Sequence, residues 1–162
     1  MDAQDARNMA LELLDVHHLS NQGWTFGWNS SHRKFGWCGF TKKQILLSHP
    51  LVLVNSPERV KDTVLHEIAH ALVGPGHHHG RVWKDKAREI GGTPRTHWDD
   101  SNTVRPATKY IGTCPNGHIT YRNARSKKTA CGRCCRERNG GKYSPEFIFT
   151  YRFNSDGISP TR

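Results

Sequence analysis

The sequence has few acidic residues and no long apolar run, and both absences narrow the classes of protein that it can encode. Against 24 lysines and arginines there are only 14 aspartates and glutamates, which gives a formal net charge of +10. So basic a chain favours a polyanionic partner. No apolar stretch approaches the roughly 20 residues that cross a bilayer, so we expect no membrane-spanning helix and no membrane partner.

Cysteines are also few, and the first residues lack the features of a secretion signal. Five cysteines in 162 residues, three of them at ligand-like spacings, do not suggest a disulfide framework. Residues 1–5 contain neither a basic run nor the start of an apolar segment, both of which a signal peptide requires. We therefore expect a cytoplasmic protein that is not secreted.

The most informative feature that is present is the five-residue pattern His66-Glu67-Ile68-Ala69-His70. Residues i and i+4 share one face of a helix, so His66 and His70 can bind the same metal ion. Glu67 follows the first histidine and can accept a proton from water, as the glutamate does in HExxH zinc hydrolases. The pattern therefore predicts a hydrolytic zinc site with Glu67 as its catalytic residue.

The flanking residues predict that this pattern lies on an amphipathic helix. Ser56-Pro57-Glu58 is typical of a helix start, with a capping hydroxyl, a proline at the first helical position and an acid in the first turn. Gly74-Pro75-Gly76 is typical of a helix end. Apolar residues at i, i+4 spacing would hold the helix in a core: Val60, Val64, Ile68 and Leu72.

A catalytic zinc ion normally has a third protein ligand, and the residues leave two alternatives for it. Metzincin spacing would need glycine and histidine where this chain has Val73 and Gly76, so that class is excluded. One alternative is a histidine of the run His77-His78-His79, just past the helix. The other is Glu89, on a second helix predicted from about residue 80 to residue 90. We favour the histidines because they follow the zinc helix directly.

The segment His66 to Leu72, followed by His79-Gly80-Arg81-Val82-Trp83, resembles the SprT-like (Spartan-type) zinc metalloprotease family. In that family the third ligand is a histidine followed by glycine, and an aromatic residue three positions later packs under the site. The resemblance gives Trp83 this packing role, whereas His77 and His78 match no ligand position. It implies the following ligands of the catalytic zinc: His66, His70 and His79.

The resemblance also implies an α+β fold with a zincin-like protease domain, and it covers residues 5 to 153. A first amphipathic helix is predicted over residues 2–18, and a short antiparallel meander precedes the zinc helix and its supporting helix. The strands of the meander are predicted at residues 24–29, 34–40 and 44–48, with a turn at 29–32. In the family a Gly-x-Cys segment like Gly36-Trp37-Cys38 lies in the meander, so we expect a packed thiol at Cys38 and not a metal ligand.

A second group of ligand-type residues follows near the C-terminus. Cys114-Pro115-Asn116-Gly117-His118 and Cys131-Gly132-Arg133-Cys134 are spaced as in structural zinc ribbons, where each ligand pair sits on a tight turn. The first pair departs from the usual Cys-x-x-Cys, which suggests a Cys3His site. Cys135 is an alternative to Cys134, although the spacing favours Cys134. SprT-like proteins often carry such a β module, so we expect a structural zinc besides the catalytic one, bound by Cys114, His118, Cys131 and Cys134.

Positive charge is concentrated around this predicted ribbon. Residues 1–92 contain 11 basic and 9 acidic residues, whereas residues 93–162 contain 13 and 5. Tyrosines at positions 110, 121 and 143 are interleaved with the basic residues and could stack on bases. The pattern predicts a salt-sensitive nucleic-acid surface, and the alternative is a solvated basic face. The expected contacts are Arg122, Arg125, Lys127, Lys128, Arg133, Arg136 and Arg138.

The polar, proline-containing stretch 93–107 is a predicted linker between two domains. It would separate a protease domain over residues 1–92 from a ribbon over residues 108–153, with a disordered tail at 154–162. The resemblance implies a zinc endopeptidase of DNA repair that cleaves proteins bound or crosslinked to DNA, with single-stranded or non-specific DNA as its partner. Two alternatives are a non-catalytic DNA- or RNA-binding zinc protein and a general peptidase without a nucleic-acid role.

Overall fold

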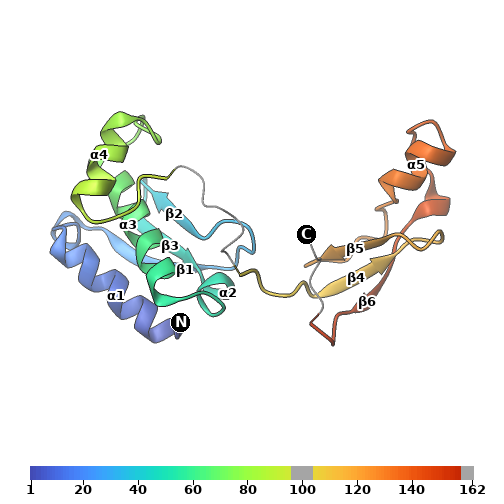
Figure 1. Cartoon of the computed structure of the whole chain (residues 1–162), viewed down its shortest axis with the longest axis horizontal. Helices are drawn as coiled ribbons and strands as arrows, with labels where there is room; N and C mark the ends of the chain where they lie inside the picture. The colour runs from blue at the N-terminus through green and yellow to red at the C-terminus, as the bar shows by residue number, and fades with distance from the viewer. Residues whose placement is uncertain (96–103, 158–162) are drawn as a thin grey trace. The chain divides into compact units, whose positions relative to one another are not determined.

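The computed structural model describes residues 1–95 and 104–157, which form two compact units (Figure 1). Unit 1 comprises Met1–Pro106 and unit 2 comprises Ala107–Arg162. The predicted linker 93–107 and the predicted tail 154–162 lie partly outside the described residues, so both stay predictions. Across the described ranges, no helix is long and apolar enough to cross a membrane. The mixed α+β class that the sequence predicts is confirmed.

Two amphipathic helices of unit 1 begin at capped residues close to the predicted positions. Helix α1, Ala3–Val16, begins after Asp2, whose carboxylate accepts the backbone N–H of Gln4 at 2.7 Å. Helix α3, Pro57–Val73, begins after Ser56, whose hydroxyl accepts the backbone N–H of Arg59, and ends at Gly74 with φ +82°. These contacts satisfy N–H groups that have no partner within the helix, and the glycine adopts a φ that other residues disfavour.

A three-stranded sheet lies against these helices, and its order differs from the predicted antiparallel meander. Strands β1 (Thr25–Asn29), β2 (Gly36–Gly39) and β3 (Gln44–Ser48) are arranged β1-β3-β2. β3 pairs antiparallel with β2 but parallel with β1, so the meander prediction is wrong. The backbone N–H of Ser31 donates to Asn29 Oδ1 at 2.9 Å and forms a turn after β1. The connection that follows leads to β2 at the far edge of the sheet, and β3 then enters between β1 and β2.

The core of unit 1 lies between one face of this sheet and helices α1 and α3 (Figure 1). Its fully buried members include Leu14 of α1, Ile45 of β3 and Ile68 of α3. A short 3-10 helix (Ser20–Gln22) and helix α2 (His49–Val52) complete the connections around it. Helix α4, Arg81–Glu89, packs on α3 through the side chains Ala69, Trp83 and Ala87.

Unit 2 contains a second three-stranded sheet, and also a helix that we did not predict from the sequence. Strands β4 (Tyr110–Thr113), β5 (Ile119–Arg122) and β6 (Thr150–Phe153) form an antiparallel sheet of order β5-β4-β6. Helix α5 spans Gly132–Arg138, and a 3-10 turn spans Pro145–Phe147. Its small core consists mainly of buried cysteines and phenylalanines: Cys114, Cys131, Cys134, Cys135, Phe147 and Phe149.

Candidate metal centres and their surroundings

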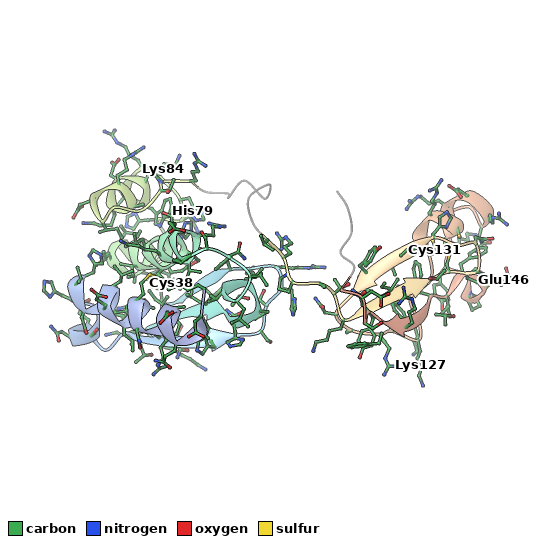
Figure 2. All side chains as sticks on the ribbon, turned by 60° about the horizontal axis from the view of Figure 1, so that its bottom comes forward. Cys38, His79, Lys84, Lys127, Cys131 and Glu146 are labelled. Carbon is green, nitrogen blue, oxygen red and sulfur yellow. The ribbon has the colours of Figure 1, made fainter. Side chains whose placement is uncertain are left out.

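The three histidines assigned to the catalytic zinc converge on one point in unit 1, and Figure 2 labels His79, the one that lies outside helix α3. His66 and His70 project from α3, and His79 comes from the loop that precedes α4. The Nε2 atom of His79 lies 3.0 Å from that of His66 and 3.1 Å from that of His70. Ligand nitrogens around a tetrahedral zinc lie about 3.3 Å apart when each zinc–nitrogen distance is about 2.0 Å. Both measured distances are therefore close to the separation that one zinc ion requires.

The surroundings of these imidazoles favour their neutral, metal-binding form. Burial lowers the pKa of His66 to about 3, and the neighbouring His70 and His79 add to the effect. Burial likewise lowers the pKa of His70 to about 4. A metal ligand must offer a lone pair, and a neutral imidazole has one on the ring nitrogen that carries no proton. The residues therefore fit a divalent cation, and their chemistry is consistent with zinc.

Trp83 lies beneath all three histidines, as the resemblance implies. It is fully buried, and its ring centroid is 4.6 Å from that of His66, 5.1 Å from that of His70 and 4.7 Å from that of His79. Because Trp83 belongs to the first turn of α4, its packing also fixes the short loop that carries His79. Glu89, the other candidate ligand, lies at the far end of α4 and forms an exposed ion pair with Lys86 at 2.6 Å.

Glu67 lies on the sheet side of α3 and is 8% exposed. Burial raises the pKa of its carboxyl to about 8, so without a nearby cation the protonated form is favoured at neutral pH. A divalent cation bound at the adjacent histidines would shift that balance towards the carboxylate, which is the form that can accept a proton. Cys38 of β2 lies near this carboxyl, and burial, followed by the charge of Glu67, raises the thiol pKa to about 12. Cys38 is thus a packed, protonated thiol and lies outside both metal clusters.

Gly36 has a role in the site that we did not predict from the sequence. A methyl group added at Gly36 would lie 2.5 Å from Glu67 Oε1, 2.8 Å from Glu67 Cγ and 2.9 Å from Thr63 Cγ2. Any larger residue at this position of β2 would displace the carboxyl. The Gly-x-Cys segment was the available signal, but its meaning depends on the approach of α3 to β2, which the sequence alone does not give.

We expect Gly36→Ala to lower the cleavage rate by about 100-fold, since a displacement of about 1 Å in a catalytic group costs that much. The zinc content should stay at the wild-type value because no ligand is changed. Steady-state cleavage and metal analysis measure the two effects. Gly39→Ala, assayed without DNA, is the matched control, because an added methyl group there meets nothing closer than 3.4 Å. A wild-type rate in Gly36→Ala would contradict this role of Gly36.

A second cluster of ligand-type atoms lies in unit 2. His118 Nδ1 is 3.1 Å from Cys134 Sγ and 3.5 Å from both Cys114 Sγ and Cys131 Sγ. Cys114 Sγ and Cys134 Sγ are 3.7 Å apart, which is about the separation expected for two sulfurs that are each about 2.3 Å from a tetrahedral zinc. These four residues form the Cys3His set predicted from the spacing, and they fit a zinc ion.

The two halves of this cluster are built differently. Gly117 has φ +78° and donates its N–H to Cys114 O at 2.9 Å, so the first half is the expected tight turn. Cys131 instead caps helix α5, and Cys134 lies in its first turn, so the prediction of a tight turn for the second half is wrong. The helical turn points Cys135 away from the cluster although it is buried. The side-chain amide of Asn116 donates to Cys134 Sγ at 3.3 Å, a contact that the spacing did not predict.

For His118→Ala we predict the loss of about one zinc ion per chain and the unfolding of unit 2. A structural zinc contributes about 10 kcal/mol or more to the folding of a small metal-dependent domain, and three remaining ligands cannot bind it as tightly. Metal analysis and thermal unfolding of the full chain measure both effects. Cys135→Ser should retain the metal, because that thiol is not a ligand. Full metal content in His118→Ala, or its loss in Cys135→Ser, would reject the Cys3His assignment.

Part of the predicted nucleic-acid surface lies on one face of the sheet in unit 2. Tyr110 of β4 pairs with Arg122 of β5 and with Phe153 of β6. The Tyr110 and Phe153 rings meet edge to face at 6.1 Å, and Phe153 is 65% exposed. The Arg125 guanidinium lies 5.1 Å from the centre of the Tyr110 ring. Two aromatic rings and two arginines therefore share this face, and Phe153 is a member that we did not predict from the sequence.

The other predicted contacts are exposed but are not part of this face. Lys127 and Lys128 follow in the connection between β5 and α5, and Lys127 projects outwards (Figure 2). Arg133, Arg136 and Arg138 lie on α5. The charge of Arg133 is partly offset because Arg133 Nε bonds to Glu137 Oε1 at 2.9 Å.

Comparison with known proteins identifies the class to which unit 1 belongs. The model of the SprT-like family matches residues 7–109 of the chain. The chain therefore belongs to the SprT-like family, a family of metallopeptidase-like proteins. The match includes α3, His79 and α4, and it ends where the second sheet begins. The family match therefore does not cover the ribbon in unit 2, which is inferred from its own ligand cluster.

A curated relative supports the same family. The chain is 35% identical over 88 residues to Protein SprT of Klebsiella pneumoniae (strain 342). The aligned segment covers 50% of this chain and 53% of that protein, so the chain spans about half the length of the curated relative. The likeness supports a SprT-type, metallopeptidase-like role for the site in unit 1.

Proposed function

We propose that this protein is a zinc-dependent endopeptidase that cleaves proteins bound or crosslinked to DNA. The observation that supports it most strongly is the convergence of three imidazoles, in which His79 Nε2 lies within 3.1 Å of the other two, beside a buried glutamate on the same helix. A structural metal site has no need of a carboxyl at that position. The zincin-like arrangement of unit 1, and the assignment of His66, His70 and His79 as ligands with Glu67 catalytic, form part of this proposal.

The reaction follows from the residues around the cluster. A zinc ion bound there would act as a Lewis acid and would make water acidic enough to react near neutral pH. Glu67 accepts the proton of the attacking water and then donates it to the leaving amine. Trp83 keeps the three imidazoles in place through its buried ring, and Gly36 leaves the space that the Glu67 carboxyl occupies.

Nucleic acid is the partner that the sheet face of unit 2 favours. Exposed aromatic rings stack on bases without regard to sequence, and nearby arginines bind phosphates. Tyr110, Phe153, Arg122 and Arg125 together provide both kinds of contact. Because nothing in this set reads base edges in a fixed pattern, we propose binding to single-stranded DNA without sequence specificity.

The test combines a charge reversal in unit 2 with an assay of DNA-stimulated cleavage. In Arg122→Glu/Arg125→Glu we expect at least tenfold weaker binding of a single-stranded oligonucleotide. The slope of the logarithm of the binding constant against the logarithm of the salt concentration should become shallower by about 1.4. This is about 0.7 for each phosphate that is no longer neutralised. DNA-stimulated proteolysis should fall in proportion. Arg7→Glu/Lys61→Glu makes the same change in net charge at exposed positions of unit 1 and should have little effect.

Two outcomes would favour the alternative functions. Cleavage that depends on Glu67 but is indifferent to both DNA and the charge reversal would indicate a general peptidase. Tight oligonucleotide binding without any Glu67-dependent cleavage would indicate a non-catalytic zinc protein that binds DNA or RNA. Either result would overturn the proposal, and each removes a different half of it.

A further inference from the structure

The sheet of unit 1 has a second face, which lies away from helices α1 and α3. Gly36 faces Glu67, and Cys38 packs against the core. Side chains alternate along a strand, so Trp37 and Gly39 face the opposite side. The register places Trp37 opposite Leu46, and Leu46 opposite Gly27. These residues, together with the loops beside them, form the outer sheet face.

The chain that forms this face contains no acidic residue. Between Asp15 and Glu58 there is neither aspartate nor glutamate, and the basic residues in that interval are Arg33, Lys34, Lys42 and Lys43. All three strands of the sheet lie within the interval. The side chains of this interval therefore carry a positive net charge, which favours an anionic partner.

Trp37 is an exposed aromatic platform on this positive face. Its side chain is 49% exposed, although tryptophan is usually well buried. The Lys34 ammonium lies 4.7 Å from the centre of the indole ring, within the range of a cation–π contact. The space above Gly39 accommodates the ring edge, since an added methyl group there would lie 3.6 Å from Trp37 Nε1. The ammonium lies over one face of the indole. Stacking of a base needs the other face of an exposed ring, and a nearby lysine can bind the phosphate.

A hollow lies next to this platform. Its volume is about 270 Å³, and it is lined by both Trp37 and Lys42, together with Phe40 and Leu46. This volume is close to the lower end of the range for small-molecule pockets. A hollow of this size suits one planar base better than several side chains of a bound peptide. The apolar residues of the lining match the base of a nucleotide, and Lys42 matches its phosphate.

We propose that the outer sheet face binds single-stranded DNA, with a base stacked at Trp37 and phosphates bound by Lys34 and Lys42. The proposal rests on the proposed function in taking DNA as the partner, and it adds a contact on the unit that contains the catalytic cluster. Gly36, the residue before Trp37, contacts the Glu67 side chain from the other side of β2. DNA held at Trp37 therefore lies on the same strand that positions the general base.

The test measures binding of a fluorescein-labelled oligo(dT) to the full chain, carried in the Glu67→Gln background so that the protein cannot cleave itself. Trp37→Ala should weaken binding by about tenfold, the usual effect of losing one base stack, and Trp37→Phe should restore most of it. In Lys34→Gln/Lys42→Gln, the slope of the logarithm of the binding constant against the logarithm of the salt concentration should become shallower by about 1.4. Leu53→Ala is the matched control, because Leu53 of unit 1 is also 49% exposed.

The inference would be overturned if Trp37→Ala and the double lysine variant bound the oligonucleotide as tightly as the wild type while Arg122→Glu/Arg125→Glu lost binding. In that case the proposed function would stand. A wild-type chain that binds no oligonucleotide would overturn both. A higher KM for a peptide substrate in Trp37→Ala, with unchanged oligonucleotide affinity, would show that the face binds the protein substrate and would also overturn it. Thermal unfolding of each variant identifies any loss of fold, and Trp37→Phe and the lysine variant do not remove core contacts.

Discussion

Replacing Glu67 with glutamine should lower peptide-bond cleavage by about a thousandfold and leave the metal content unchanged. General acid–base catalysis contributes about 10²- to 10⁴-fold, and glutamine has the size of glutamate without its ability to accept a proton. The side chain is 8% exposed against β2, so a substitution that conserves its shape should not disturb packing. Cleavage kinetics and metal analysis on the same preparation measure both effects.

Glu89→Gln is the matched control for this result, because it makes the same chemical change on the neighbouring helix. Glu89 is paired with Lys86 at the surface, and we expect a wild-type rate when it is replaced. Near-normal cleavage by Glu67→Gln would remove the general base from the mechanism. A low rate in Glu89→Gln would revive the alternative in which that carboxylate is a ligand.

Replacing His79 with alanine should abolish cleavage and remove about one of two zinc ions per chain. Two histidines from α3 remain, but a catalytic zinc normally needs three protein ligands. The His79 Nε2 atom lies close to those of both His66 and His70, so its loss opens the cluster on the side of the loop. Unit 2 should keep its own metal, and this separates the loss of one site from general unfolding.

His78→Ala provides the comparison for His79→Ala, since the two residues are adjacent. The structure places His78 outside the cluster, with a positive φ of 42° and an exposed or half-exposed loop around it. We expect its replacement to leave metal content at the wild-type value. Loss of zinc in His78→Ala with retention in His79→Ala would show that the loop presents a different histidine to the metal.

The elements that contain local signals could be predicted from the sequence. A serine cap, a proline at the first helical position and a terminal glycine specify α3 without help from the rest of the chain. The ligand spacings likewise led to both clusters, because i, i+4 on a helix and short Cys/His intervals are local relations. His79 required more than spacing, since three successive histidines offered equivalent chemistry and the family resemblance favoured one of them.

What the sequence did not specify depends on contacts between distant segments. Alternation predicts three strands, but it does not say that β3 enters between β1 and β2 and runs parallel to β1. The same limit applies to Gly36, whose importance arises only where β2 approaches Glu67. Helix α5 was missed because the Cys-x-x-Cys spacing of Cys131 and Cys134 fits two local structures equally well. It can lie on a tight turn or on the first turn of a helix, and the structure has the helix.

The most direct test of the proposed function is cleavage of one DNA-binding protein substrate, measured with and without single-stranded DNA, by the wild-type chain and by Glu67→Gln. We predict cleavage by the wild type that rises strongly when DNA is added, and cleavage by the variant that is about a thousandfold slower under either condition. The same rate of wild-type cleavage with and without DNA would contradict a DNA-directed peptidase. Cleavage by Glu67→Gln at a rate near that of the wild type would contradict the catalytic site itself.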